Sequence, residues 1–148
     1  MTVLVPVLYT LLAGDATLTA QLASYNGSPA IFSNQRVPAD VSAPYVVISP
    51  PVTDNSFDAL KELGRDIVHD VWVVFPETGS VTALDTAAER VRTLLHKTTL
   101  SVTGFQHVQS FASGPTVAPI ESTRSGFQQD EVDEVGRLIS VRVLLRKL

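Results

Sequence analysis

The sequence predicts an α+β domain, with a mainly antiparallel sheet of about four to five strands and two main helices packed on one face of the sheet. Its segments follow the order helix, strand, strand, helix, strand, strand. Helices therefore do not alternate regularly with strands, and most connections suit hairpins, which favours an antiparallel sheet. The 148 residues suffice for a single domain, 1–148, with one hydrophobic core.

Two segments carry the apolar spacing of a helix. In Val3–Ala13, leucines and valines recur every three or four residues, Pro6 falls in the first turn, and Gly14 provides a stop. Asp15 can then cap a second, short helical run. Ser80–Lys97 is the longer helix, and its apolar stripe comprises Val81, Leu84, Ala87, Ala88, Val91, Leu94 and Leu95.

Four segments read as strands, and the chain between them reads as connection. Prolines bracket the first strand, "YVVIS", and Gly114-Pro115 ends the third, "GFQHVQSFAS". The second is Asp66–Phe75 and the last is "RLISVRVLLRKL". The segment 30–44 is predicted to be loop with at most a short strand at Ile31-Phe32. The polar segment 52–65 is predicted to be a connection, with at most one helical turn at Asp58–Leu63.

The strand Asp66–Phe75 is apolar on both of its faces. Ile67, Val71, Val73 and Phe75 point to one face, and Val68, Trp72 and Val74 point to the other. Two helices cannot blanket both faces of such a sheet, so the second face needs another cover. A partner subunit is one candidate, because large apolar patches mark interfaces, and Trp72 and Val74 are then interface residues. The alternative is that loops or the first helix of the same chain cover it.

Composition and motifs favour a protein without catalytic function. A net charge of -4 gives no basic face for nucleic acid, and the absence of cysteine removes disulfides, thiolate metal sites and thiol nucleophiles. The apolar start lacks the basic region of a signal peptide. His69, His96 and His107 lack metal-ligand spacing, and no nucleotide-binding or hydrolase motif occurs. We therefore expect no enzymatic activity and no cofactor or metal.

Two charged groups near the C-terminus have a surface role. Asp130, Glu131, Asp133 and Glu134 lie in a segment expected to be a flexible acidic loop, near 119–136. The loop could face a partner or a lumen, and it lacks the glycine and spacing of a calcium-binding loop. Arg142 and Arg146 lie on one face of the last strand, and we expect them to pair with acidic groups of a neighbouring subunit.

Several ordered landmarks resemble one family. These are "LYTLLAGDATLTAQL", "RVPADVSAPYVVIS", "HDVWVVF" followed by "ALDTAAERVRTLL", and the closing "DEVDEVGRLISVRVLL". In this order they resemble the tail-terminator, or tail-completion, proteins of long-tailed bacteriophages and gene transfer agents. The resemblance covers almost the whole chain and includes no short catalytic or ligand motif.

The resemblance implies a structural virion protein that assembles into a homo-oligomeric ring, typically of six subunits. Such a ring caps the tail tube, ends tail polymerisation and offers the surface to which the DNA-filled head attaches. The implied partners are the tail tube protein and a neck or head-completion connector protein, and DNA passes through without specific binding or any membrane contact. The protein would be made in the host cytoplasm and end in the virion tail or neck.

Two other functions remain open from the sequence. The first is another neck or head-completion connector protein, which composition does not distinguish from a terminator. The second is a small ligand-binding or enzymatic α+β domain, which requires His69, His107 and the acidic loop to converge in one cleft.

Overall fold

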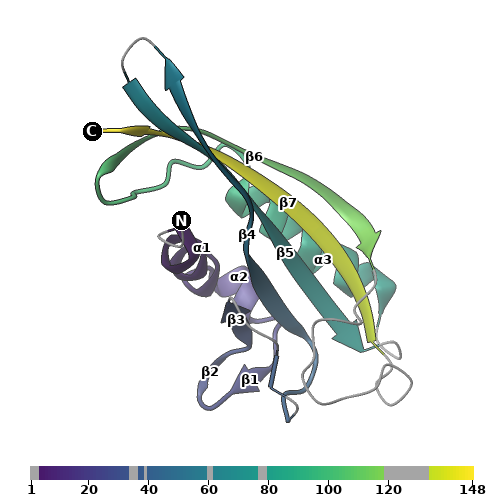
Figure 1. Ribbon diagram of the computed structural model, residues 1–148. Coiled ribbons are helices and arrows are strands. Elements are labelled where there is room, and N and C mark those ends of the chain that lie inside the picture. The colour runs from purple at the N-terminus through teal and green to yellow at the C-terminus, as the bar shows by residue number, and fades with distance from the viewer. Residues whose placement is uncertain (1–3, 34–36, 39, 60–61, 77–79, 119–133) are drawn as a thin grey trace.

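A five-stranded sheet with helices on one face forms the body of the molecule (Figure 1). The computed structural model describes residues 4–33, 37–38, 40–59, 62–76, 80–118 and 134–148. The elements in chain order are α1 (Leu4–Ala13), α2 (Ala16–Thr19), β1 (Ser24–Tyr25), β2 (Ser28–Pro29), β3 (Ile31–Ser33), β4 (Tyr45–Ala59), β5 (Glu62–Pro76), α3 (Val81–Leu95), β6 (Phe105–Ala118) and β7 (Glu134–Lys147).

The sheet is mainly antiparallel, which confirms the predicted fold class. Its strand order is β3-β4-β5-β7-β6, and only the short β3 runs parallel to its neighbour. A separate two-stranded hairpin is formed by β1 and β2. No described helix is long and apolar enough to cross a membrane.

Both main helices, α1 and α3, form where the sequence predicts them, and side chains cap the starts of α3 and of the short α2. The Ser80 hydroxyl accepts a hydrogen bond from the backbone N–H of Ala83 at 3.2 Å and so caps α3. Asp15 caps α2 in the same way through Leu18 N at 2.9 Å. The guanidinium of Arg90 on α3 also donates two bonds to the Asp15 carboxylate, at 2.9 and 2.6 Å, which joins the two helices.

The main core lies between the helices and one face of the sheet. Leu4, Leu8 and Leu12 of α1 are fully buried there. Of the predicted α3 stripe, Leu84, Ala87, Ala88, Val91 and Leu95 are buried, Leu94 is half-buried, and Val81 at the start of the helix is exposed. The sheet contributes alternate residues of its central strands to this core, namely Val46, Ile48, Ile67, Val71, Val73, Ile139, Val141, Val143 and Leu145. The prediction that both helices pack on one sheet face is therefore confirmed.

The prediction for residues 52–65 is wrong, because this segment is a β-hairpin. Thr53 to Ala59 of β4 pair with Val68 to Glu62 of β5, beyond a register shift around Pro51. We call the part of β4 and β5 beyond this shift the arm. In Figure 1 it projects past α1 at the end of the sheet where the C-terminus lies. Pairing of β4 with β5, and of β5 with β7, holds this part of β4 extended although Thr53, Asn55 and Ser56 are exposed.

The third predicted strand also extends further than expected. It does not end at Gly114-Pro115, because β6 continues to Ala118 after a register shift between Ser113 and Thr116. A bulge of this kind places the proline outside the ladder, so the strand does not lose a hydrogen bond at this point.

Candidate interaction surface

The second face of β5 is covered in part by the same chain. Val74 is fully buried in a second, smaller hydrophobic cluster with Tyr45, Val47, Ala30, Val37 and Val41. Trp72 packs against this cluster and remains half-exposed. At Val74 the second face of β5 is therefore covered by segments of the same chain, as in the alternative considered above. Val74 has no exposed surface for a direct contact with a neighbour.

Beyond this cluster, no helix or loop among the described residues covers the second face. We define the open face as Val68, Trp72, Phe111, Leu138 and Leu144. Strand register places these residues on one side of the sheet. Trp72 is opposite Leu138, and further along the strands Val68, Arg142 and Phe111 lie opposite one another on β5, β7 and β6. Four of them are half-buried and Phe111 is 39% exposed, whereas both main helices pack on the opposite face. On the open face these five apolar residues alternate with polar ones, including Asp66, Asp70, Ser140 and Arg142, and no described helix covers them.

Arg142 lies within the open face and already has an acidic partner. Its guanidinium donates to both carboxylate oxygens of Asp66, at 2.8 and 2.5 Å. The hydrogen bonds from Arg142 hold the pKa of Asp66 below its ordinary value. An acidic partner on a neighbouring subunit was predicted for Arg142, whereas Asp66 belongs to the same chain. Because the Arg142 side chain is 57% exposed, the pair adds little to stability.

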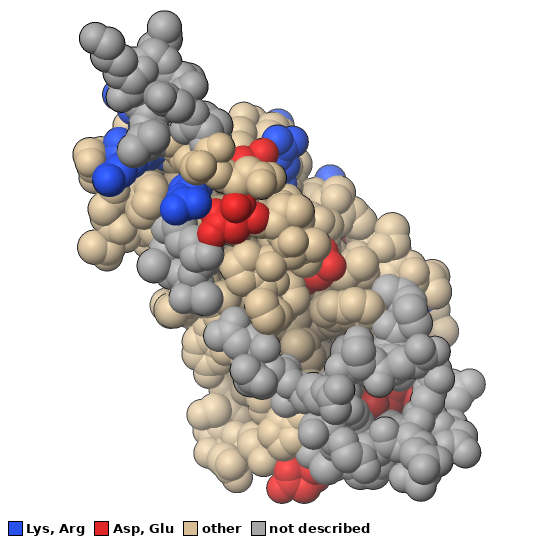
Figure 2. Space-filling model, in the orientation of Figure 1, with Lys and Arg blue, Asp and Glu red and all other residues tan. Residues whose placement is uncertain are grey.

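Arg146 lies at the arm end of the sheet. It is exposed on β7, opposite Gly64 of β5 and Gln106 of β6. In Figure 2 the Lys and Arg side chains in view gather toward this end, while the middle of that side is mostly uncharged. Other arginines lie away from this end, since Arg137 is near the start of β7 and Arg90 and Arg92 are on α3.

The predicted acidic loop is described only at its last residues. Asp130, Glu131 and Asp133 lie outside the described residues. Glu134 is the first residue of β7, so it belongs to a strand, and its carboxylate accepts a hydrogen bond from the Tyr45 hydroxyl at 3.2 Å. This bond ties the start of β7 to the second hydrophobic cluster.

The histidines have separate structural environments. His69 is fully buried on the core face of β5, where its Nδ1 lies 2.9 Å from the Ser49 carbonyl oxygen. His96, at the end of α3, accepts a bond from the N–H of Ala112. His107 lies on β6 level with Leu145, whereas His69 is level with Val141. They do not meet in one cleft, and among the described residues no group of three or more potential ligands could hold a metal ion.

Burial of His69 makes stability depend on pH. Desolvation lowers its pKa below 6.5, so the folded protein favours the neutral ring. The stabilisation of the fold by neutral, buried His69 is fully present above pH 6.5. It is lost as the pH falls below that value, because the unfolded chain then binds a proton that the folded chain does not. We expect the free energy of unfolding to decrease by at most about 1.4 kcal/mol per pH unit from this one group. Urea denaturation at pH 7.5 and 5.5 measures the decrease, and it should be smaller in His69→Gln; an equal decrease in both proteins would contradict the assignment.

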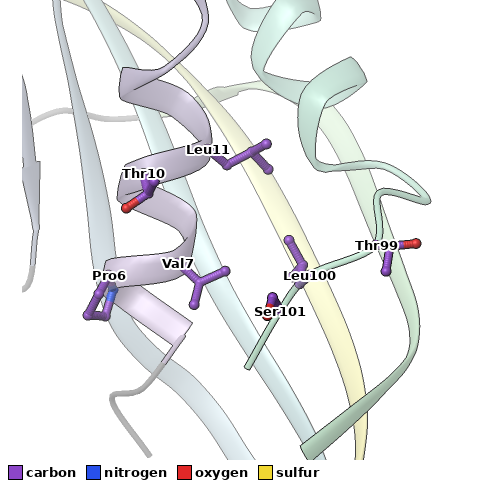
Figure 3. A pocket seen from close by; sticks show the side chains of 7 residues that line it. All are labelled: Pro6, Val7, Thr10, Leu11, Thr99, Leu100 and Ser101. Atoms are coloured by element: carbon purple, nitrogen blue, oxygen red, sulfur yellow. The ribbon is translucent and has the colours of Figure 1, made fainter. Parts of the chain in front are cut away.

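One open groove lies on the helical side of the molecule (Figure 3). It has a volume of about 410 Å³ and lies between α1 and the segment 99–101. Its lining residues are Pro6, Val7, Thr10, Leu11, Thr99, Leu100 and Ser101. None of these side chains titrates near neutral pH, so the groove contains no acid, base or charged anchor.

Comparison with known proteins finds similarity among solved structures. No protein-family model matches the sequence, and no curated protein matches it. Among solved structures, a chain from an entity described as "Virion of native gene transfer agent (GTA) particle" superposes with a TM-score of 0.71 at 19% sequence identity. The match covers 95% of this chain and 92% of that chain. At this identity the likeness establishes a shared fold over almost the full length of both chains.

Proposed function

We propose that this protein is a structural virion component that forms a ring, of six copies, on the end of a tail tube. In this role it ends tail polymerisation and provides the surface to which the head attaches. The observation that carries the proposal is the near-complete match to a chain of a gene transfer agent virion. The resemblance of the sequence landmarks to tail terminators supplies the specific role.

The open face supports assembly with copies of the same chain. The half-buried residues Trp72, Leu138 and Leu144 lie on a sheet surface that no described helix covers. Apolar patches of this kind mark protein–protein contacts, and a closed head-to-tail ring would cover the same patch on every copy. Within this proposal Trp72 contributes to the subunit contact directly. Val74 supports it from beneath, while Arg142 and Arg146 border the contact.

The remaining partners follow from the same role. One side of the ring would meet the tail tube protein and the other a neck or head-completion protein, with DNA passing through the bore. Asp130, Glu131, Asp133 and Glu134 would then face a partner or the bore, where like charge repels the DNA phosphates. The protein would assemble in the host cytoplasm and remain in the virion.

Electron microscopy of particles from an amber mutant in this gene tests the role. Loss of a tail terminator should give abnormally long tails and tails without heads, because polymerisation has no stop. Leaky heads beside tails of normal length would instead assign the protein to head completion. Particles of normal appearance and infectivity or transfer activity would contradict both roles.

A further inference from the structure

Strand β4 has a free outer edge along the arm. Among the described strands, β3 is its only neighbour on that side, and it pairs with Val46, Val47 and Ile48. Beyond Ile48, no described strand lies on this side of β4, although β4 continues to Ala59. Thr53, Asn55 and Ser56 are exposed there. Unpaired N–H and C=O groups on such an edge can pair with another strand.

The opposite edge of the sheet, β6, is free over a short matching stretch. Near its middle the edge is occupied, because Lys97 N donates to Ser110 O at 3.0 Å and Ala112 N donates to His96 Nδ1 at 3.2 Å. Near its start, Phe105 bridges to Val102. Between these two covers, residues 106–109 have no described strand on their outer side.

The two free edges lie level with each other and run in compatible directions. Asn55 pairs with Asp66, Asp66 with Leu144, and Leu144 with Gln109, so Asn55 and Gln109 share one row of the sheet. Because each neighbouring pair from β4 to β6 is antiparallel, β4 and β6 run in opposite directions. A β4 arm of another copy placed beside β6 would continue the antiparallel pattern.

A charged residue lies near each edge. Strand β4 contains Asp54, which is also 3.4 Å from the Arg65 guanidinium of β5 and therefore already has one basic partner within the arm. On the other edge, Lys97 is exposed in the segment that covers β6 at Ser110, and Ser110 lies in the same row as Asp54. An incoming β4 would therefore bring its Asp54 toward Lys97. Opposite charges across neighbouring strands favour pairing.

We infer that a second copy of this chain adds the outer edge of its β4 arm to residues 106–109 of β6, so that the sheet continues from one subunit to the next. This inference rests on the proposed ring and specifies its junction. The contact joins two different edges, so it is head-to-tail and repeats around a ring. This junction extends the sheet sideways from β6 and does not itself cover Trp72 on β5, so the open face is a second, separate contact of the proposed ring.

Cysteine cross-linking tests the junction on a clean background, because the chain has no cysteine. The double variant Asn55→Cys/Gln109→Cys places the two thiols on the same sheet face, in one row. Oxidation should give a ladder of disulfide-linked multimers. Each single variant should stay monomeric on a denaturing gel, and an equimolar mixture of the two single variants should give dimers only.

A one-residue shift supplies the matched control. Ser56 lies in the row of Arg65, Leu145 and His107, so its side chain points to the opposite face from Gln109. The variant Ser56→Cys/Gln109→Cys should therefore give at least about ten-fold less cross-linked product, because a disulfide needs Cβ atoms about 4 Å apart.

Oxidation is carried out on the purified protein and on isolated particles, and the same samples are viewed by electron microscopy. Rings without cross-links in the double variant would overturn the edge junction and leave the proposed function standing. Self-linking of either single variant would also overturn the junction, because it requires a two-fold contact. Failure to cross-link in both samples counts against the junction, while tail ends without rings count against the proposed function.

Discussion

Replacing Gly114 with alanine is expected to lower the free energy of unfolding by about 3 kcal/mol or more. Gly114 has a φ of +107°, a backbone conformation that residues with a side chain rarely adopt. A Cβ atom there would lie 2.5 Å from the Leu138 carbonyl oxygen and 3.3 Å from Thr116 N. Both contacts are with backbone, so no side chain can rotate away, and β6 would have to move from β7.

Gly104 provides the matched control for this variant. Its φ is +83°, but a Cβ atom there would have no other atom within 4 Å. Gly104→Ala should thus cost only the backbone strain, about 1–2 kcal/mol. Urea unfolding followed by the fluorescence of Trp72, the only tryptophan, measures both variants. A loss at Gly114 no larger than that at Gly104 would show that the bulge relaxes around the added methyl group.

The sequence predicts the helices and the core strands because their buried apolar residues recur at the spacing of a helix or a strand within each segment. In α3 the buried residues Leu84, Ala87, Ala88, Val91 and Leu95 follow the helical repeat. The arm gives no such signal. Thr53, Asn55 and Ser56 face solvent, and what makes them a strand is pairing with β5, a long-range property.

The interaction surface is less predictable for a related reason. The two-sided apolar pattern around Trp72 is visible in the sequence, but its cover depends on distant residues. Val37 and Val41 lie in a proline-containing loop without strand or helix periodicity, yet both are buried against Val74. Only the strand order, which places β7 beside β5, identifies Asp66 as the partner of Arg142.

Replacing Trp72 with aspartate is expected to abolish ring formation while leaving a folded chain. Trp72 is half-exposed at the border between the second hydrophobic cluster and the open face, so a carboxylate there can keep its water. We expect a loss of about 1–2 kcal/mol in the free energy of unfolding. In an assembled ring the same carboxylate would be buried against a neighbour without a partner, a cost that prevents association.

Val74→Asp separates assembly from folding. Val74 lies two residues along β5 on the same sheet face and is fully buried, so its carboxylate would lack both water and a partner in the single chain. That substitution should cost about 3–5 kcal/mol and unfold much of the protein. Light scattering after size-exclusion chromatography reports assembly, and urea unfolding reports stability. If both substitutions lowered the free energy of unfolding equally, Trp72 would be an ordinary core residue. If Trp72→Asp still formed rings, the open face would not belong to the subunit contact, because a ring that buried this carboxylate without a partner would not form.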